Sequence, residues 1–127
     1  MGAPRATDPA VVLIVDDEPS IAQVVAMTVE DAGATPLVAH GGREALALAR
    51  SERITLVITD LMMPLLDGAG LVRALRQEAA THGQAMPAVI LMTAASQQHA
   101  EKVGADAVLW KPFDLAELDT LLHRYLG

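Results

Sequence analysis

Short apolar runs and amphipathic stretches alternate along the 127-residue chain. Four of the runs are almost wholly apolar and rich in β-branched side chains, which is typical of strands buried on both faces of a parallel sheet. A weaker fifth run lies between the first two. The predicted strands are residues Val11–Val15, Pro36–Ala39, Leu56–Thr59, Ala88–Met92 and Ala107–Trp110.

The stretches between these runs carry apolar or small residues at helical spacing. In the first stretch they recur at positions i, i+3, i+4, i+7 and i+8 from Ile21 to Val29, and Gly33 is placed to end the helix. Further helices are predicted after Gly41-Gly42, from Gly68, from Ser96 to Val103 before Gly104, and from Asp114 to Tyr125, where Asp114 and Glu117 form a capping-box pattern.

Strict alternation of five strands and five helices predicts one α/β domain with a doubly wound, parallel five-stranded sheet and helices on both faces. We assign residues 10–127 to this domain and residues 1–9, which contain Gly and two Pro, to a flexible N-terminus. In open parallel sheets, function collects at the carboxyl ends of the strands. Functional residues are therefore expected at that edge.

Polar residues follow four of the predicted strands. They are Asp16 and Asp17 after the first strand, Asp60 after the third, Thr93 and Ala94 after the fourth, and Lys111 after the fifth. Taken singly, each is commonplace at a turn or a helix start. Because the carboxyl ends of parallel strands meet at one edge, we expect all of these residues to lie together.

Three carboxylates at one place repel one another unless a cation joins them. Oxygen ligands without His or Cys indicate Mg²⁺. The charges of Mg²⁺ and Lys111 would cancel those of the three carboxylates, and the Thr93 hydroxyl and the Ala94 N–H add donors for an anionic oxygen. This combination is typical of phosphoryl transfer, in which catalysis consists mostly of positioning and charge neutralisation.

Composition narrows the possible functions. A net charge of -7 and an aromatic content of 2% argue against direct binding of nucleic acid. The chain has no cysteine, which excludes disulfides and thiolate metal sites. The N-terminal stretch has no apolar run typical of a signal peptide, and no apolar run is long enough to span a membrane. A cytoplasmic protein is expected.

The order and spacing of these motifs resemble the receiver domains of bacterial two-component response regulators, in particular single-domain regulators of the chemotaxis type. The resemblance covers about residues 10–126 and implies a flavodoxin-like receiver fold. It rests on Val15-Asp16-Asp17-Glu18-Pro19, the segment from Thr59-Asp60 through Met63-Pro64 to Asp67-Gly68, Thr93-Ala94 and Lys111-Pro112-Phe113.

The resemblance implies a role for each site residue. Asp60 would accept the phosphoryl group from a sensor histidine kinase or a histidine phosphotransfer protein, and the domain would then signal to a downstream protein. Asp17 would bind Mg²⁺ directly, Asp16 through a water and Met62 through its carbonyl, while Thr93, Ala94 and Lys111 would contact the phosphoryl group. The Lys111–Pro112 bond would be cis. No enzymatic activity is expected beyond the domain's own phosphorylation and dephosphorylation.

Two features depart from the family pattern. Val108 stands three residues before Lys111, where the family has a switching Tyr or Phe, and the segment between Thr93 and Lys111 is about one helical turn short. We therefore expect phosphorylation to order Ala95–Val103 rather than to rotate a ring at position 108. Trp110 is expected to pack near the sheet edge.

The sequence is compatible with other functions. The chain could be a complete regulator, which Met1 favours slightly, or a receiver from a larger regulator or a hybrid kinase. An aspartate-nucleophile phosphatase would have a second acid two residues after the nucleophile, where this chain has Met62. An FMN carrier would need a Gly- and hydroxyl-rich loop where Asp16 and Asp17 stand. A receiver that no longer takes up phosphate is a further alternative.

Overall fold

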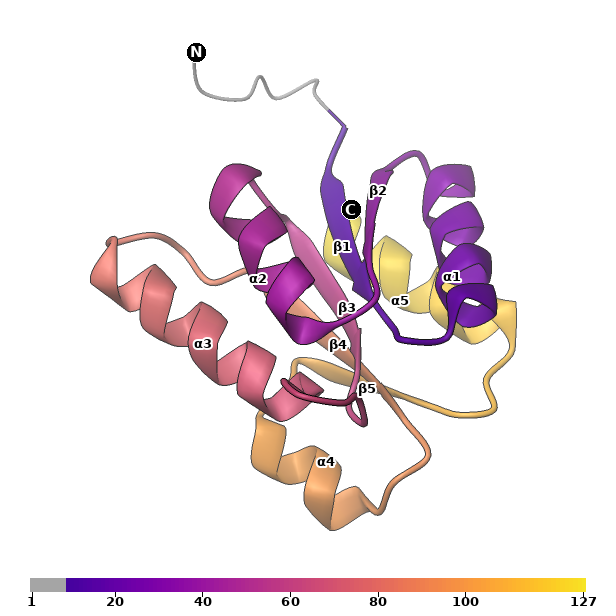
Figure 1. Ribbon diagram of the computed structural model, residues 1–127. Coiled ribbons are helices and arrows are strands. Elements are labelled where there is room, and N and C mark those ends of the chain that lie inside the picture. The colour runs from indigo at the N-terminus through magenta and orange to yellow at the C-terminus, as the bar shows by residue number, and fades with distance from the viewer. Residues whose placement is uncertain (1–8) are drawn as a thin grey trace.

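Five parallel strands form the centre of the molecule, as the alternating pattern predicts (Figure 1). The computed structural model describes residues 9–127, so most of the predicted flexible N-terminus lies outside the described residues. The strands run in the order β2-β1-β3-β4-β5. They are β1 (Val11–Val15), β2 (Thr35–Ala39), β3 (Leu56–Asp60), β4 (Ala88–Thr93) and β5 (Ala107–Trp110).

Five helices alternate with the strands, and their bounds agree closely with the sequence prediction. They are α1 (Pro19–Asp31), α2 (Gly42–Ser51), α3 (Gly68–Thr81), α4 (Gln97–Val103) and α5 (Leu115–Leu126). Gly33 has a positive φ just past α1, and the Asp114 side chain accepts a hydrogen bond from the Glu117 N–H at the start of α5. No helix within residues 9–127 is both long enough and apolar enough to cross a lipid bilayer.

The helices cover the two faces of the sheet unequally. Helices α1 and α5 pack on one face, and α2, α3 and α4 pack on the other (Figure 1). Side chains that alternate along each strand feed two separate apolar cores: Ile14, for example, faces α1 and α5, whereas Leu13 faces α2 and α3. With both faces covered, the central strands are buried beyond the first residues of β1 and β4, which explains their continuous apolar sequences.

The strand register brings the predicted site residues to one edge. Asp60 ends β3 and pairs with Met92, so Thr93 lies one residue beyond it on the neighbouring strand. Thr93 in turn pairs with Trp110, the residue before Lys111. The convergence expected from parallel strands is therefore present in the fold.

Helix α4 is the shortest helix, with seven residues. The Ser96 side chain caps its start by accepting from the His99 N–H, and Gly104, with a φ of 70°, ends it in the left-handed conformation. The short length matches the sequence prediction. Trp110 lies at the sheet edge, as expected, but it packs only in part, because 40% of its surface is exposed. It is the last residue of an edge strand, where only the short α4 lies beside it.

Candidate functional site

Three carboxylates meet at the carboxyl edge of the sheet. Asp16 and Asp17 follow β1, and Asp60 is the last residue of β3. One oxygen from each side chain lies within 4.8 Å of the corresponding oxygens of the other two. Asp16 and Asp60 are buried, whereas Asp17 is exposed. The predicted convergence of these three side chains is confirmed.

Lys111 brings a positive charge to this cluster. Its Nζ lies 3.2 Å from Asp16 Oδ2 and 3.3 Å from Asp60 Oδ1. The backbone helps to hold the lysine in place, because the Lys111 N–H donates to the Thr93 carbonyl at 2.8 Å. The Lys111–Pro112 peptide is cis. The predicted position of Lys111 and its cis peptide are both present.

The two neighbouring aspartates differ in the donors that surround them. Asp16 Oδ1 accepts from the Glu18 N–H at 2.9 Å, and Asp16 Oδ2 faces Lys111, so both oxygens already have protein donors. Within residues 9–127, no protein donor contacts the exposed Asp17 carboxylate. Asp17 is therefore better placed to bind a cation directly, and Asp16 is better placed to assist through a water.

Burial raises the pKa of Asp60. Lys111 opposes the rise, whereas the negative charges of Asp16 and Asp17 add to it. The pKa of Lys111 is also raised: burial alone would lower it, but the hydrogen bond with Asp16 and the charges of Asp16 and Asp60 outweigh burial. The raised pKa of Asp60 therefore reflects mainly the burial of its carboxyl group beside Lys111.

Thr93 and Ala94 complete this edge of the site. The Thr93 side chain is buried, and its Oγ1 accepts from the Ala95 N–H at 2.8 Å. Because the hydroxyl acts as acceptor in that bond, its own hydrogen is free to be donated. Ala94 is exposed, and its N–H has no acceptor within the described residues. Both groups are able to donate to an anionic oxygen.

The loop after Asp60 turns sharply back on itself. The Gly68 N–H donates to the Leu61 carbonyl at 2.9 Å, and a Cβ at Gly68 would lie 2.9 Å from the Leu61 Cα and would also clash with the Asp60 carbonyl. Only glycine allows α3 to begin so close to the Asp60 backbone. Within the same loop Met63 is buried, whereas Met62 is 68% exposed, so its side chain packs little and its backbone carbonyl remains the candidate ligand.

Leu65 has a strained backbone at the tip of this loop. Its φ is 69°, and its side chain is 90% exposed. A leucine in the left-handed region costs about 1 kcal/mol, whereas asparagine tolerates that region and would lose no burial. We expect Leu65→Asn to raise the melting temperature by roughly 4 °C in thermal unfolding. Leu115→Asn, at a half-exposed leucine of ordinary backbone, is the matched control, and an equal gain there would contradict the strain argument.

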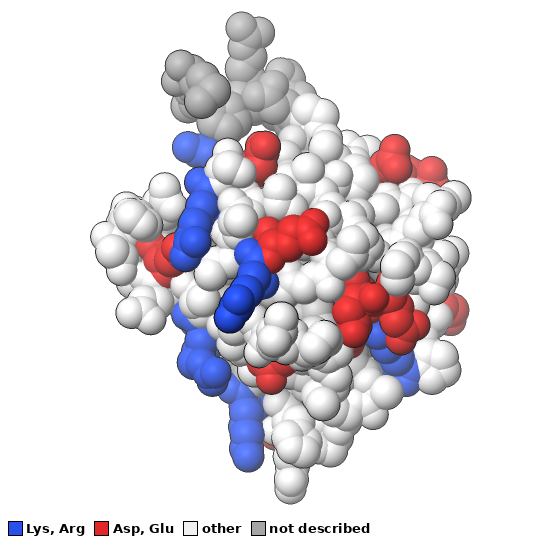
Figure 2. All heavy atoms as spheres, in the orientation of Figure 1, with Lys and Arg blue, Asp and Glu red and all other residues white. Residues whose placement is uncertain are grey.

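Charge is divided unevenly over the surface. In Figure 2, lysine and arginine gather over α2, α3 and α4, and acidic side chains predominate on the half nearer α1. Five arginines belong to α2, α3 or the loop that follows α2, namely Arg43, Arg50, Arg53, Arg73 and Arg76. The net charge of -7 therefore falls mainly on the other half of the molecule, which suits the attraction of cations to the acidic site.

The family model for the response regulator receiver domain matches residues 12–123. The chain belongs to this family. Among curated proteins, the receiver domain is 34% identical to an uncharacterized 14.6 kDa protein in the sodA1 3′ region of Leptolyngbya boryana, covering 90% of this chain and 88% of that protein. It is also 35% identical to the alkaline phosphatase synthesis transcriptional regulatory protein PhoP of Bacillus subtilis, covering 91% of this chain and 48% of PhoP.

Solved receiver structures share the same fold. The chemotaxis response regulator CheY4 of Vibrio cholerae superposes with a TM-score of 0.82 at 36% identity, covering 94% of this chain and 100% of CheY4. The signal receiver domain of a signal transduction histidine kinase from Syntrophus aciditrophicus has a TM-score of 0.81 at 30% identity, covering 92% of this chain and 89% of that one. The five-stranded sheet of order β2-β1-β3-β4-β5 is thus the flavodoxin-like receiver fold.

Two long-range side-chain contacts in the receiver were not predicted from the sequence. The Arg76 guanidinium on α3 donates to the Val103 carbonyl at 3.0 Å and to the Gly104 carbonyl at 2.6 Å, at the end of α4. His40 Nδ1 lies 3.2 Å from the Asp16 carbonyl oxygen. Neither residue belongs to a local motif, because each reaches a partner far away along the chain. No local sequence pattern marks either residue.

Proposed function

We propose that this receiver domain takes a phosphoryl group on Asp60 from a phosphohistidine of a sensor histidine kinase or a histidine phosphotransfer protein. The change of conformation that follows is read by a downstream protein. The observation that carries the proposal is the placement of Asp60, which lies at the end of a buried strand, 3.3 Å from Lys111 and within a cluster of three carboxylates.

The residues present fit a Mg²⁺ ion. The donors are carboxylate oxygens, which this ion prefers, and no imidazole or thiolate belongs to the cluster. Asp17 and Asp60, together with the Met62 carbonyl, would hold the ion, and Asp16 would assist through a water. A bound Mg²⁺ would supply positive charge that offsets the negative charge of the transferred group.

The proposed transfer forms one bond and breaks one. A carboxylate oxygen of Asp60 attacks the phosphorus, the P–N bond to the donor histidine breaks, and the imidazole nitrogen keeps the electron pair. Lys111 is close enough to stabilise the incoming phosphoryl oxygens, and the Thr93 hydroxyl and Ala94 N–H can donate to the same group. The product is an acyl phosphate, which water hydrolyses to inorganic phosphate and the free carboxylate.

Exposed apolar side chains around the site support a protein as the phosphodonor. Met62 and Leu65 are 68% and 90% exposed on the loop that follows Asp60. A small molecule that reaches Asp60 has no need of these side chains, whereas a protein surface that presents a phosphohistidine would cover them. We propose that this loop contacts the donor protein.

Residues 10–127 form the whole receiver domain in this proposal. Among its relatives, the domain accounts for most of the protein from Leptolyngbya but spans only about half of PhoP. The activity and partners of the longer proteins therefore do not transfer to this chain. A stand-alone regulator and a receiver within a longer protein share the same chemistry at Asp60.

The test is phosphorylation of the intact chain by a small phosphodonor such as acetyl phosphate. With Mg²⁺, the intact mass is expected to increase by one phosphoryl group, and chelation of the metal should abolish the increase. No increase at any Mg²⁺ concentration would contradict the proposal. Uptake of several phosphoryl groups would indicate nonspecific phosphorylation rather than a dedicated acceptor.

Phosphorylation is expected to order the segment Ala95–Val103. The Thr93 hydroxyl now holds the Ala95 N–H, and a phosphoryl group on Asp60 would draw that hydroxyl away, so the segment must find a new arrangement. Hydrogen exchange with and without phosphodonor should show increased protection centred on residues 95–103. Unchanged protection there, together with a strong response of residues 106–110, would show that the segment is not the part that responds.

A further inference from the structure

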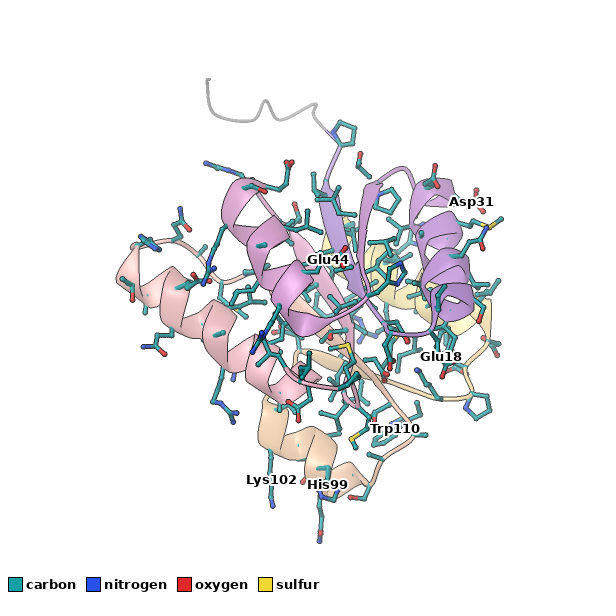
Figure 3. All side chains as sticks on the ribbon, viewed as in Figure 1. Glu18, Asp31, Glu44, His99, Lys102 and Trp110 are labelled. Atoms are coloured by element: carbon teal, nitrogen blue, oxygen red, sulfur yellow. The ribbon has the colours of Figure 1, made fainter. Side chains whose placement is uncertain are left out.

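Trp110 stands at the rim of a groove between α4 and β5. The groove has a volume of about 380 Å³ and is lined by Gln97 and Ala100 of α4 and by Val108 and Trp110 of β5. Side chains alternate along a strand, so Val108 and Trp110 face α4, whereas Leu109 packs into the opposite core with α1 and α5. In Figure 3, Trp110 lies beside α4, the helix that also carries His99 and Lys102.

The groove exists because its neighbours are small. The small side chains of Val108 and Ala100 leave a groove between α4 and β5, and Val108 has one stiff rotamer and no ring. The indole of Trp110 is 40% exposed directly beside this space. Its aromatic surface would be removed from water if the side chain turned into the groove.

Trp110 is coupled to the site through the backbone of β4. It pairs with Thr93 in the sheet, and the next residue, Lys111, donates its N–H to the Thr93 carbonyl at 2.8 Å. A movement of Thr93 toward Asp60 therefore acts directly on the end of β5. No other tryptophan occurs in the chain.

Helix α4 is held differently at its two ends. At the C-terminal end of α4, Arg76 donates to the carbonyls of Val103 and Gly104, and this contact does not involve the acidic site. Ahead of its start, the Ala95 N–H is held by the Thr93 hydroxyl at 2.8 Å. If the hydroxyl is drawn to a phosphoryl group, the start of α4 can shift to a new position while its C-terminal end stays anchored.

Resting on the proposed function, we propose that Trp110 is the aromatic switch of this receiver. On phosphorylation, α4 turns about the end that Arg76 holds, and the Trp110 indole packs into the groove over Val108. Gln97 and Ala100, which line the groove near the start of α4, move with that end and close over the indole, which orders the segment. A side chain one residue before Lys111 thus takes part in the switch, while Val108 provides the space.

Because Trp110 is the sole tryptophan, intrinsic fluorescence reports on it directly. With acetyl phosphate and Mg²⁺, the emission maximum should move to shorter wavelength, and quenching by acrylamide should fall by roughly half as the indole leaves solvent. The intact mass of the same sample is measured in parallel. An added phosphoryl group with unchanged or increased quenching overturns the inference and leaves the proposed function standing. Absence of the added group overturns both.

Two variants separate this motion from a direct effect of charge on the fluorophore. Val108→Phe fills the groove, so the chain should still gain the phosphoryl group but lose the change in quenching; Val108→Leu serves if the phenylalanine prevents folding. Arg76→Ala removes the anchor and should weaken the fluorescence response. Arg73→Ala, an exposed arginine on the same helix, is the matched control and should respond as the wild type does. A full response in both Val108→Phe and Arg76→Ala overturns the inference.

Discussion

An Asp60→Ala chain is expected to gain no phosphoryl group under conditions in which the wild type gains one. Asp60 is the carboxylate at the centre of the site, since it lies 3.3 Å from Lys111 and belongs to the three-carboxylate cluster. Alanine removes the attacking oxygen altogether, so the loss should be complete rather than partial. Intact mass after incubation with acetyl phosphate and Mg²⁺ measures the outcome. A persistent mass increase would show that another residue is the acceptor.

Loss of folding would not account for the absence of phosphorylation in Asp60→Ala. The pKa of Asp60 is raised, chiefly by burial, so its ionised form disfavours the folded state. Alanine removes this penalty, and Lys111 keeps its contact with Asp16. Without metal at neutral pH, Asp60→Ala should therefore be at least as stable as the wild type in thermal unfolding. Asp31→Asn, at an exposed carboxylate that ends α1, is the matched control and should be phosphorylated normally.

The sequence was sufficient to predict the sheet and its functional edge. Buried parallel strands need continuous apolar runs, and β-branched residues such as those of Val11–Val15 fulfil that need. Once five strands are parallel, the positions of Asp16, Asp60 and Lys111 at the strand ends follow from topology alone. The prediction of the site therefore depended on strand order and needed no side-chain detail.

Side-chain positions that depend on distant residues could not be predicted in this way. The exposure of Trp110 depends on how little of β5 the short α4 covers, which no local pattern records. The contacts of Arg76 with Val103 and Gly104 join residues far apart in the chain. The left-handed backbone of Leu65 is required by the tight return of its loop, whereas its sequence would favour an ordinary conformation.

For the short segment before β5, the sequence and the three-dimensional structure each contribute to the predicted switch. Its length and the small residue at position 108 are visible in the sequence, and both predicted an unusual switch. The groove beside Trp110 and the different anchoring of the two ends of α4 are visible only in three dimensions. The sequence alone predicted a switch without an aromatic side chain at position 108. The groove and the contacts of α4 instead favour a switch that uses Trp110.

Magnesium is expected to stabilise the fold through the same carboxylates. At ten to a hundred times the dissociation constant, binding to the folded state contributes about 1–3 kcal/mol, which should raise the melting temperature by roughly 4–10 °C. Asp17→Asn should abolish most of this rise in melting temperature, because Asp17 is the exposed carboxylate of the cluster and accepts no hydrogen bond from residues 9–127. Asp31→Asn should leave the rise unchanged. A melting temperature that does not respond to Mg²⁺ would contradict the metal site.

The increase in melting temperature that Mg²⁺ causes should become smaller as the pH is lowered. Burial raises the pKa of Asp60 in the folded state above the unfolded value of 3.8. Without metal, the contribution of Asp60 to the free energy of unfolding is therefore greatest below pH 3.8. This contribution is lost as the pH rises through the folded-state pKa. Mg²⁺ requires the ionised carboxylate, so its effect follows the opposite course. Melting curves with and without Mg²⁺ should therefore differ most near neutral pH and converge toward pH ~4. In Asp60→Ala, the pH dependence that Asp60 contributes to this difference should be absent.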